Sequence, residues 1–389
     1  MRCRFRVVAI ATVALSLTPS ARAALVGTVL YQVKTPSFDI GSTHSGGGEP
    51  QTAAGTQVVG SGAGNATGFS NHPLLWTSPS GNPIDLTPTN LTGFNSGTAL
   101  GTDGVHQVGL GAGPSFGTNE EALLWSGAAN TAVNLNPTNL TGIGSAEAFG
   151  VNGTQQVGDG FGTATSNRIH ALVWNGTANS AVDLNPAGFI MSTATGTSGT
   201  RQVGFGAGTA TGNDNHALVW NGTAASAVDL NPTGFSTSFA QAANGTKQAG
   251  YGASSSGQNH ALLWTGTAAS FIDLNPSGFS SSQAEGMNAT QQVGYGITTP
   301  GVDLHALLWS STAASAVDLN ALLPASGSWD DSLAYTIDTA GNVYGTADGT
   351  FNGVSGQYAV VWSVPEPSSL ALVALALAGV RPTRRRGVS

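Results

Sequence analysis

The sequence predicts an all-β protein, a seven-bladed β-propeller built from four-stranded repeats. Three observations support this: a motif ending in tryptophan recurs seven times, each repeat holds four segments of strand length, and turn residues separate those segments. Successive motif tryptophans lie 49, 49, 46, 44, 45 and 53 residues apart. A repeat of about 40 to 45 residues with four strands is typical of one propeller blade. The alternative is a β-solenoid, whose rungs are usually about 20 to 30 residues long.

The tryptophan motif is an apolar pentapeptide, for example His-Ala-Leu-Val-Trp at His216 to Trp220. Neighbouring blades cover a blade on both faces, so a nearly continuous apolar strand is expected there instead of an alternating one. The first position is Glu121 in the second copy and Tyr358 in the last. The other five copies begin with histidine: His72, His170, His216, His260 and His305.

Three further segments complete each repeat. A Val-Gly element such as Gln202 to Gly206 precedes the pentapeptide, and an Asp-Leu element such as Val228 to Pro232 follows it. The fourth segment has an Ala-x-x-x-Asn pattern, as in Ala240 to Asn244, and leads into the next Val-Gly element. The Asn-Gly pair at Asn244 and Gly245 supplies the positive φ angles that tight hairpins need, which favours strands over helices.

The repeated histidines suggest structure and not chemistry. Equivalent positions in successive blades are spread around a ring, so these side chains cannot converge on one metal ion. We expect each to make a hydrogen bond within its blade to the recurrent aspartates Asp85, Asp183, Asp229, Asp273 and Asp318. The single cysteine, Cys3, lies in the predicted signal peptide, so cysteine chemistry is not expected in the mature protein. No catalytic, cofactor-binding or metal-binding residue is predicted elsewhere in the chain.

One position varies from repeat to repeat, directly after the repeated alanine of the fourth segment. If that segment forms the innermost strand, these side chains border the central channel. A constant scaffold with one variable position per repeat is what a binding surface would look like, although drift at an unconstrained position explains the variation nearly as well. The predicted channel-lining residues are Leu100, Phe149, Thr195, Gln241, Glu285 and Tyr335.

The count of strands indicates how the ring closes. There are seven tryptophan strands but only six Asp-Leu-type elements after them, so the last blade lacks its outer strand. Phe38 to Ile40 resembles the Asp-Leu element and precedes a Val-Gly element at Val59 and Gly60. We expect this segment to pair with Tyr358 to Trp362, which would leave no open sheet edge.

The distribution of charge excludes one class of partner. Residues 24 to 363 hold four basic and nineteen acidic residues, a formal net charge of −15. Nucleic acid is therefore not expected as a partner.

The N-terminus reads as a secretory signal over residues 1 to 23. Arg2, Arg4 and Arg6 precede an apolar stretch, and Ala21 and Ala23 form a small-x-small cleavage site. This predicts export by the Sec machinery and a mature chain that begins near Ala24.

The C-terminal segment, residues 364 to 389, has three features in a fixed order. Pro365, Glu366 and Pro367 come first, an apolar run follows, and Arg384, Arg385 and Arg386 come last. This order resembles the PEP-CTERM sorting signal of Gram-negative bacteria, which implies processing by an exosortase-type protease at the cell envelope. The apolar run of 11 residues would span about 17 Å as a helix, against a hydrocarbon core of about 30 Å. We therefore expect transient or weak anchoring by this transmembrane segment.

Within the predicted propeller repeat domain, residues 24 to 363, the pentapeptide also resembles the extracellular HAF repeats, in which His-Ala-Phe precedes tryptophan and an Asp-Leu strand. Here the third residue is leucine or valine. The two resemblances imply an exported, non-catalytic module at the cell surface or in the medium, with extracellular polysaccharide or another envelope component as its ligand. The alternative is a carbohydrate-active propeller enzyme, a glycosidase or lyase.

Overall fold

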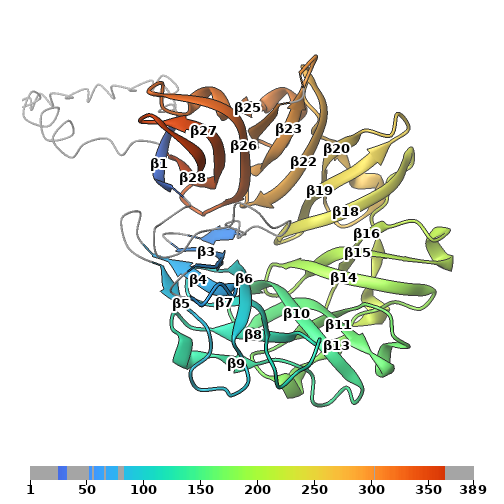
Figure 1. Ribbon diagram of the computed structural model, residues 1–389. Helices are drawn as coiled ribbons and strands as arrows, with labels where there is room; N and C mark the ends of the chain where they lie inside the picture. The colour runs from blue at the N-terminus through green and yellow to red at the C-terminus, as the bar shows by residue number, and fades with distance from the viewer. Residues whose placement is uncertain are drawn as a thin grey trace, which may run out of the picture. The chain divides into compact units, whose positions relative to one another are not determined.

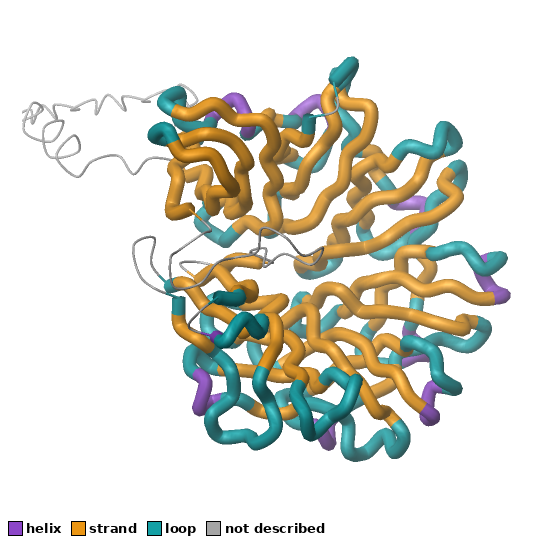
Figure 2. The backbone as a smooth tube through the Cα atoms, viewed as in Figure 1, coloured by secondary structure: helices purple, strands orange, loops and turns teal. Residues whose placement is uncertain are grey.

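The computed structural model describes residues 25–32, 52–54, 57–64, 67–77, 83–301 and 303–363. Within these ranges, strands form seven four-stranded antiparallel sheets around a common centre (Figures 1 and 2). The predicted all-β, seven-bladed propeller is confirmed. Helices in the same ranges are 3-10 turns of three residues, namely Ala129–Thr131, Thr163–Thr165, Ala178–Ser180, Thr209–Thr211, Ala224–Ser226, Ala268–Ser270, Ala313–Ser315 and Asn320–Leu322.

Each sheet is one blade, and the strands of the first six blades follow one another in chain order from the centre outwards. Blade one comprises β2 (Thr52–Ala54), β3 (Gln57–Gly62), β4 (His72–Trp76) and β5 (Ile84–Asp85). Blades two and three comprise β6 (Ser96–Thr102), β7 (Gln107–Ala112), β8 (Glu121–Trp125), β9 (Val133–Asn134), β10 (Ile143–Asn152), β11 (Gln155–Gly162), β12 (His170–Trp174) and β13 (Val182–Asp183). Blades four and five comprise β14 (Phe189–Thr197), β15 (Gln202–Gly208), β16 (His216–Trp220), β17 (Val228–Asp229), β18 (Phe235–Asn244), β19 (Lys247–Ser254), β20 (Asn259–Trp264) and β21 (Ile272–Asp273). Blade six comprises β22 (Phe279–Met287), β23 (Gln292–Thr298), β24 (Leu304–Trp309) and β25 (Val317–Asp318).

The hydrophobic core lies between blades, which explains the apolar pentapeptides. Trp264 of blade five is fully buried and packs against Val203, Val219 and Leu230 of blade four. Equivalent clusters join blades one to two, two to three, three to four and five to six. Truncation of such a buried tryptophan to alanine typically costs about 3 to 5 kcal/mol.

Blade seven is closed by a strand from the other end of the chain. Its three inner strands are β26 (Gly327–Ile337), β27 (Val343–Phe351) and β28 (Val354–Ser363), and its outer strand is β1 (Val26–Gln32), which lies beside β28 (Figure 1). The innermost strands of blades one and seven, β2 and β26, are also in contact. The predicted closure by an N-terminal strand is therefore confirmed, and a solenoid is excluded.

The prediction that Phe38 to Ile40 closes the ring was wrong. Tyr358 to Trp362 pairs with β27 on one side and with Gly27 to Gln32 on the other, so both of its edges are occupied. Phe38 to Ile40 lies outside the described residues, as do Ala21, Ala23, Pro365 to Pro367 and Arg384 to Arg386.

A polar pair fastens the short outer strand of each of the first six blades. In five of them the histidine Nδ1 lies 2.7 to 2.8 Å from the aspartate Oδ2, as predicted for His216 and Asp229 and their equivalents. The other aspartate oxygen accepts the backbone N–H two residues on, for example that of Asn231 at 2.7 Å. In blade two the polarity is reversed, because the Asn134 amide donates to the Glu121 carboxylate at 2.9 Å.

Residues Val26–Ser363 form one compact unit. Within the described ranges, no helix has the length and apolar character that a membrane crossing requires.

Candidate functional site

The variable position of the repeat is the extra residue of a β-bulge. In blade four, Ala194 pairs with Gly204 and Gly196 pairs with Val203, so Thr195 has no partner across the ladder. A Cβ on Gly204 would collide with the carbonyl oxygen of Thr193, which explains why a glycine recurs at this position beside the bulge. The same shift skips the six predicted residues Leu100, Phe149, Thr195, Gln241, Glu285 and Tyr335. Bulges of this kind redirect one side chain without interrupting the sheet.

Five of these bulge residues line one cavity of about 650 Å³ at the centre of the ring, which we call the channel cavity. Its wall consists of the carboxyl ends of the innermost strands and the hairpins that follow them. Leu100 is the exception, since its neighbour Gly101 forms the wall in blade two. The bulge residues in the described part of the wall are Phe149, Thr195, Gln241, Glu285 and Tyr335.

Glu285 is the acidic residue among these five bulge positions. Burial raises the pKa of its carboxyl to about 7, although a hydrogen bond from the Gln241 amide at 3.3 Å acts in the opposite direction. Burial, together with the Glu285 charge, raises the pKa of Tyr251 to about 12 and that of Tyr295 even further. Tyr335 contributes to the same rise at Tyr295. Glu285 therefore lies close to Tyr251 of blade five and Tyr295 of blade six.

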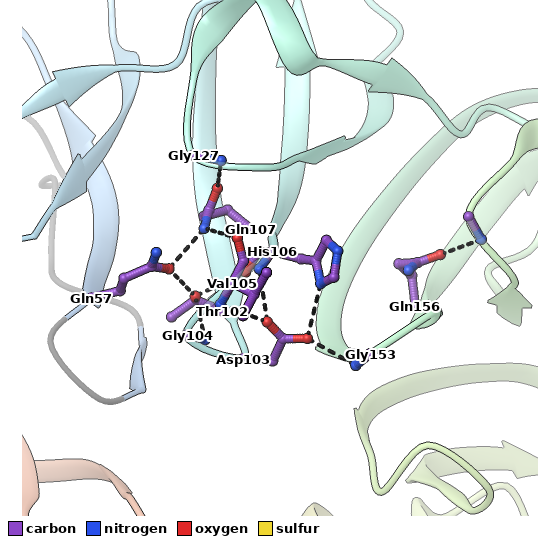
Figure 3. A network of polar contacts seen from close by, with 11 residues as sticks. Gln57, Thr102, Asp103, Gly104, Val105, His106, Gln107, Gly127, Gly153 and Gln156 are labelled. Carbon is purple, nitrogen blue, oxygen red and sulfur yellow. Dashed lines mark hydrogen bonds and ion pairs between the residues drawn. The ribbon is translucent and has the colours of Figure 1, made fainter.

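A polar network forms the rim of the channel cavity where blades one, two and three meet (Figure 3). The side-chain Oε1 of Gln57 accepts hydrogen bonds from the Thr102 hydroxyl at 2.9 Å and from the side-chain Nε2 of Gln107 at 2.7 Å. Asp103 accepts the backbone N–H of His106 at 2.7 Å and that of Gly153 at 2.8 Å. Burial of Asp103 raises its pKa, but these hydrogen bonds outweigh it, so the net pKa is lowered. Asp103 is thus an ionised structural clasp between blades two and three.

A second, smaller cavity of about 290 Å³ lies at the other end of β10. Glu147 and Asp159 face each other across β10 and β11 and both line it. Burial raises the pKa of Glu147 to about 8, with further increases from a hydrogen bond to Glu120 and the Asp159 charge. Burial also raises the pKa of Asp159 to about 7, against a 2.9 Å hydrogen bond from Thr193. Burial and mutual repulsion therefore favour the protonated forms of these two carboxyls.

The sequence reasoning missed Tyr251, Tyr295 and Asp159. All three occupy the middle of a Gly-x-Gly run, for example Gly250-Tyr251-Gly252, on the second strand of a blade. The variable residue between two fixed glycines was the signal that could have identified them. Across the described residues, no group of three or more histidine, cysteine, aspartate or glutamate side chains is placed to hold a metal ion.

Comparison with known proteins identifies the sorting signal and the fold. The PEP-CTERM protein-sorting motif matches residues 363–386. The motif is recognised in exosortase-type processing and indicates that the protein is exported and sorted to the cell envelope. A search of curated proteins found no match to the chain.

Two solved structures illustrate the likeness of fold. The β-propeller domain of the Trilobed protease from Pyrococcus furiosus is 10% identical, with a TM-score of 0.51 over 80% of this chain and 93% of that one. Puromycin hydrolase is 12% identical, with a TM-score of 0.50 over 78% of this chain, which spans only 50% of the hydrolase. At these identities the likeness concerns the fold alone. The molecule is thus an exported seven-bladed β-propeller with a C-terminal sorting motif.

Proposed function

We propose that this protein is a non-catalytic envelope or extracellular module that binds polysaccharide in the channel cavity. The observation that supports the proposal is the bulge: in blades three to seven it places one side chain on the wall of the channel cavity, and these side chains differ from blade to blade. A fixed scaffold of repeated Gly, Ala and Trp holds the aromatic Phe149, the amide Gln241 and the acid Glu285 on one wall. Aromatic faces combined with a few placed polar groups are typical of ligand sites.

The setting agrees with this proposal. The sorting motif places the protein at the envelope, where polysaccharide is abundant, and the resemblance to extracellular HAF repeats fits the same setting. Sec export, cleavage near Ala21 and Ala23, and processing at Pro365 to Pro367 belong to the same proposal.

The test is a glycan array probed with the exported, mature protein, followed by calorimetry with each glycan that binds. Phe149→Ala should weaken binding by up to about tenfold, because an aromatic contact of this kind contributes about 0.5 to 1.5 kcal/mol. Phe161→Ala is the matched control, since Phe161 lines the second cavity and is 44% exposed. Binding that falls with Phe161→Ala and not with Phe149→Ala would contradict the choice of cavity.

The second candidate function is a carbohydrate-active enzyme, and one observation favours it. Glu147 and Asp159 form a pair of carboxyls with raised pKa values in a cavity, and paired carboxyls are the catalytic groups of most glycosidases. Chromogenic glycosides test it: turnover that is lost in both Glu147→Gln and Asp159→Asn would overturn the non-catalytic proposal.

A further inference from the structure

The charges on the wall of the channel cavity are all of one sign. Among the described residues that line it, the acidic ones are Asp103, Glu285 and Asp338, and none is lysine, arginine or histidine. The whole domain also carries an excess of acidic residues. A low-dielectric cavity of one sign concentrates counter-ions of the opposite sign.

Two of the three acids are held by strong hydrogen bonds from the protein itself. Asp103 accepts the N–H groups described above. Asp338 accepts the backbone N–H of Asn342 at 2.9 Å and its side-chain amide at 2.8 Å. These contacts compensate the negative charge within the structure, so both acids stabilise their hairpins.

Glu285 is placed differently. Its contact with the Gln241 amide, at 3.3 Å, is longer than a strong charge-assisted hydrogen bond. The tyrosines close enough to respond to its charge are Tyr251 and Tyr295, and their raised pKa values keep both hydroxyls neutral at physiological pH. Among the described groups that face Glu285, none is cationic, and burial of the carboxylate without a counter-charge is unfavourable.

We propose that Glu285 binds an ammonium group of the ligand, so that the polysaccharide recognised in the channel cavity carries free amino groups on its sugars. This inference rests on the proposed function. An ammonium group would compensate the Glu285 charge and lower the pKa of its carboxyl below the value of about 7 that burial gives it. Phe149 and Tyr335 on the same wall add aromatic faces, which attract cations.

Other ligand chemistries fit this wall less well. A divalent cation such as Ca²⁺ takes six to eight oxygen ligands, whereas the described residues offer no group of three metal-ligating side chains here. A neutral sugar would donate hydroxyl hydrogen bonds to Glu285 but would leave its charge uncompensated. An anionic polysaccharide would be repelled.

The experiment compares the trisaccharide of glucosamine with the trisaccharide of N-acetylglucosamine by calorimetry at pH 7, using the mature protein. Acetylation removes the ammonium group and keeps the sugar ring. We expect the free amine to bind at least tenfold more tightly. Glu285→Gln should remove this preference, while Asp214→Asn, which makes the same change in charge at an exposed position, should retain it.

Equal affinity for the two trisaccharides in the wild-type protein would overturn the ammonium inference and leave the proposed function standing. Ethanolamine that binds as tightly as the glucosamine trisaccharide would instead overturn polysaccharide binding. If neither trisaccharide binds, both proposals fail. The wild-type comparison decides the matter even if Glu285→Gln fails to fold, and a folded variant that keeps the preference would also contradict the role of Glu285.

Discussion

Gly27 of the closing strand offers the sharpest test of how the ring is held together. It is buried and lies opposite Trp362 in the pairing of β1 with β28. A Cβ at this position would lie 2.7 Å from the carbonyl oxygen of Leu322 and 3.1 Å from the Cα of Leu323. Both are backbone atoms of the segment after β25, so Gly27→Ala must displace β1 or that segment.

Overpacking of this kind costs about 1 to 3 kcal/mol. For a domain of about 340 residues, an unfolding entropy of about 2.1 cal/mol/K per residue converts 2 kcal/mol into a fall in Tm of about 3 °C. Differential scanning calorimetry measures this change. Thr28→Ala on the same strand is the control, because Thr28 is exposed and its truncation should change Tm by less than about 1 °C. A Gly27→Ala protein that melts with the wild type would refute closure by β1.

Three further predictions concern the buried carboxyl of Glu147, the polar pair of blade two and the processing of the chain ends. Because the folded-state pKa of Glu147 is raised to about 8, its proton favours folding, and that contribution is lost as pH rises from about 4.5 through 8. In urea unfolding, Glu147→Gln should therefore be more stable than the wild type by about 1 to 2 kcal/mol at pH 9, a figure reduced for partial exposure, and as stable as the wild type near pH 4. Equal stability of the two proteins at both pH values would argue against the buried proton. In blade two, Glu121→His alone should lower the free energy of unfolding by about 1 kcal/mol, and adding Asn134→Asp should restore it, since the pair then matches the His–Asp pairs of the other blades. Additive losses of stability in denaturant unfolding would contradict the role of this polar pair. Mass spectrometry of the exported protein should find an N-terminus near Ala24 and a tail trimmed near residues 365–367, whereas an intact cytoplasmic chain would defeat both processing assignments.

The blades could be predicted because their signal is repeated. Particular residue types recur at one spacing along the chain because the structure requires them. They are the buried tryptophans, the glycine beside each bulge, and the histidine and aspartate of the polar pair. The closing strand occurs once and lacks the Asp-Leu pattern of the other outer strands, which is why Phe38 to Ile40 was chosen wrongly. In blade seven the Tyr358 hydroxyl donates to the Val354 carbonyl at 2.5 Å, so no outer aspartate is needed.

The candidate site could be predicted only in part. The bulge residues can be recognised in the sequence because they vary beside a repeated alanine. The bulge itself is a feature of the backbone, and no residue type predicts it. Tyr251 and Tyr295 come from the second strands of their blades, and strand order alone does not say which of those side chains lie near Glu285. The raised pKa values depend on burial, which follows from the closed ring and not from local sequence.

The central claim is that ligand binds where the bulge residues converge, and hydrogen exchange read by mass spectrometry tests it most directly. The mature protein is exchanged with and without the glucosamine trisaccharide at a saturating concentration. The account predicts protection in peptides that contain Phe149, Gln241, Glu285 and Tyr335, with no change in the outer strands. Protection confined to residues 118–119 and 161–169, around the second cavity, would contradict it.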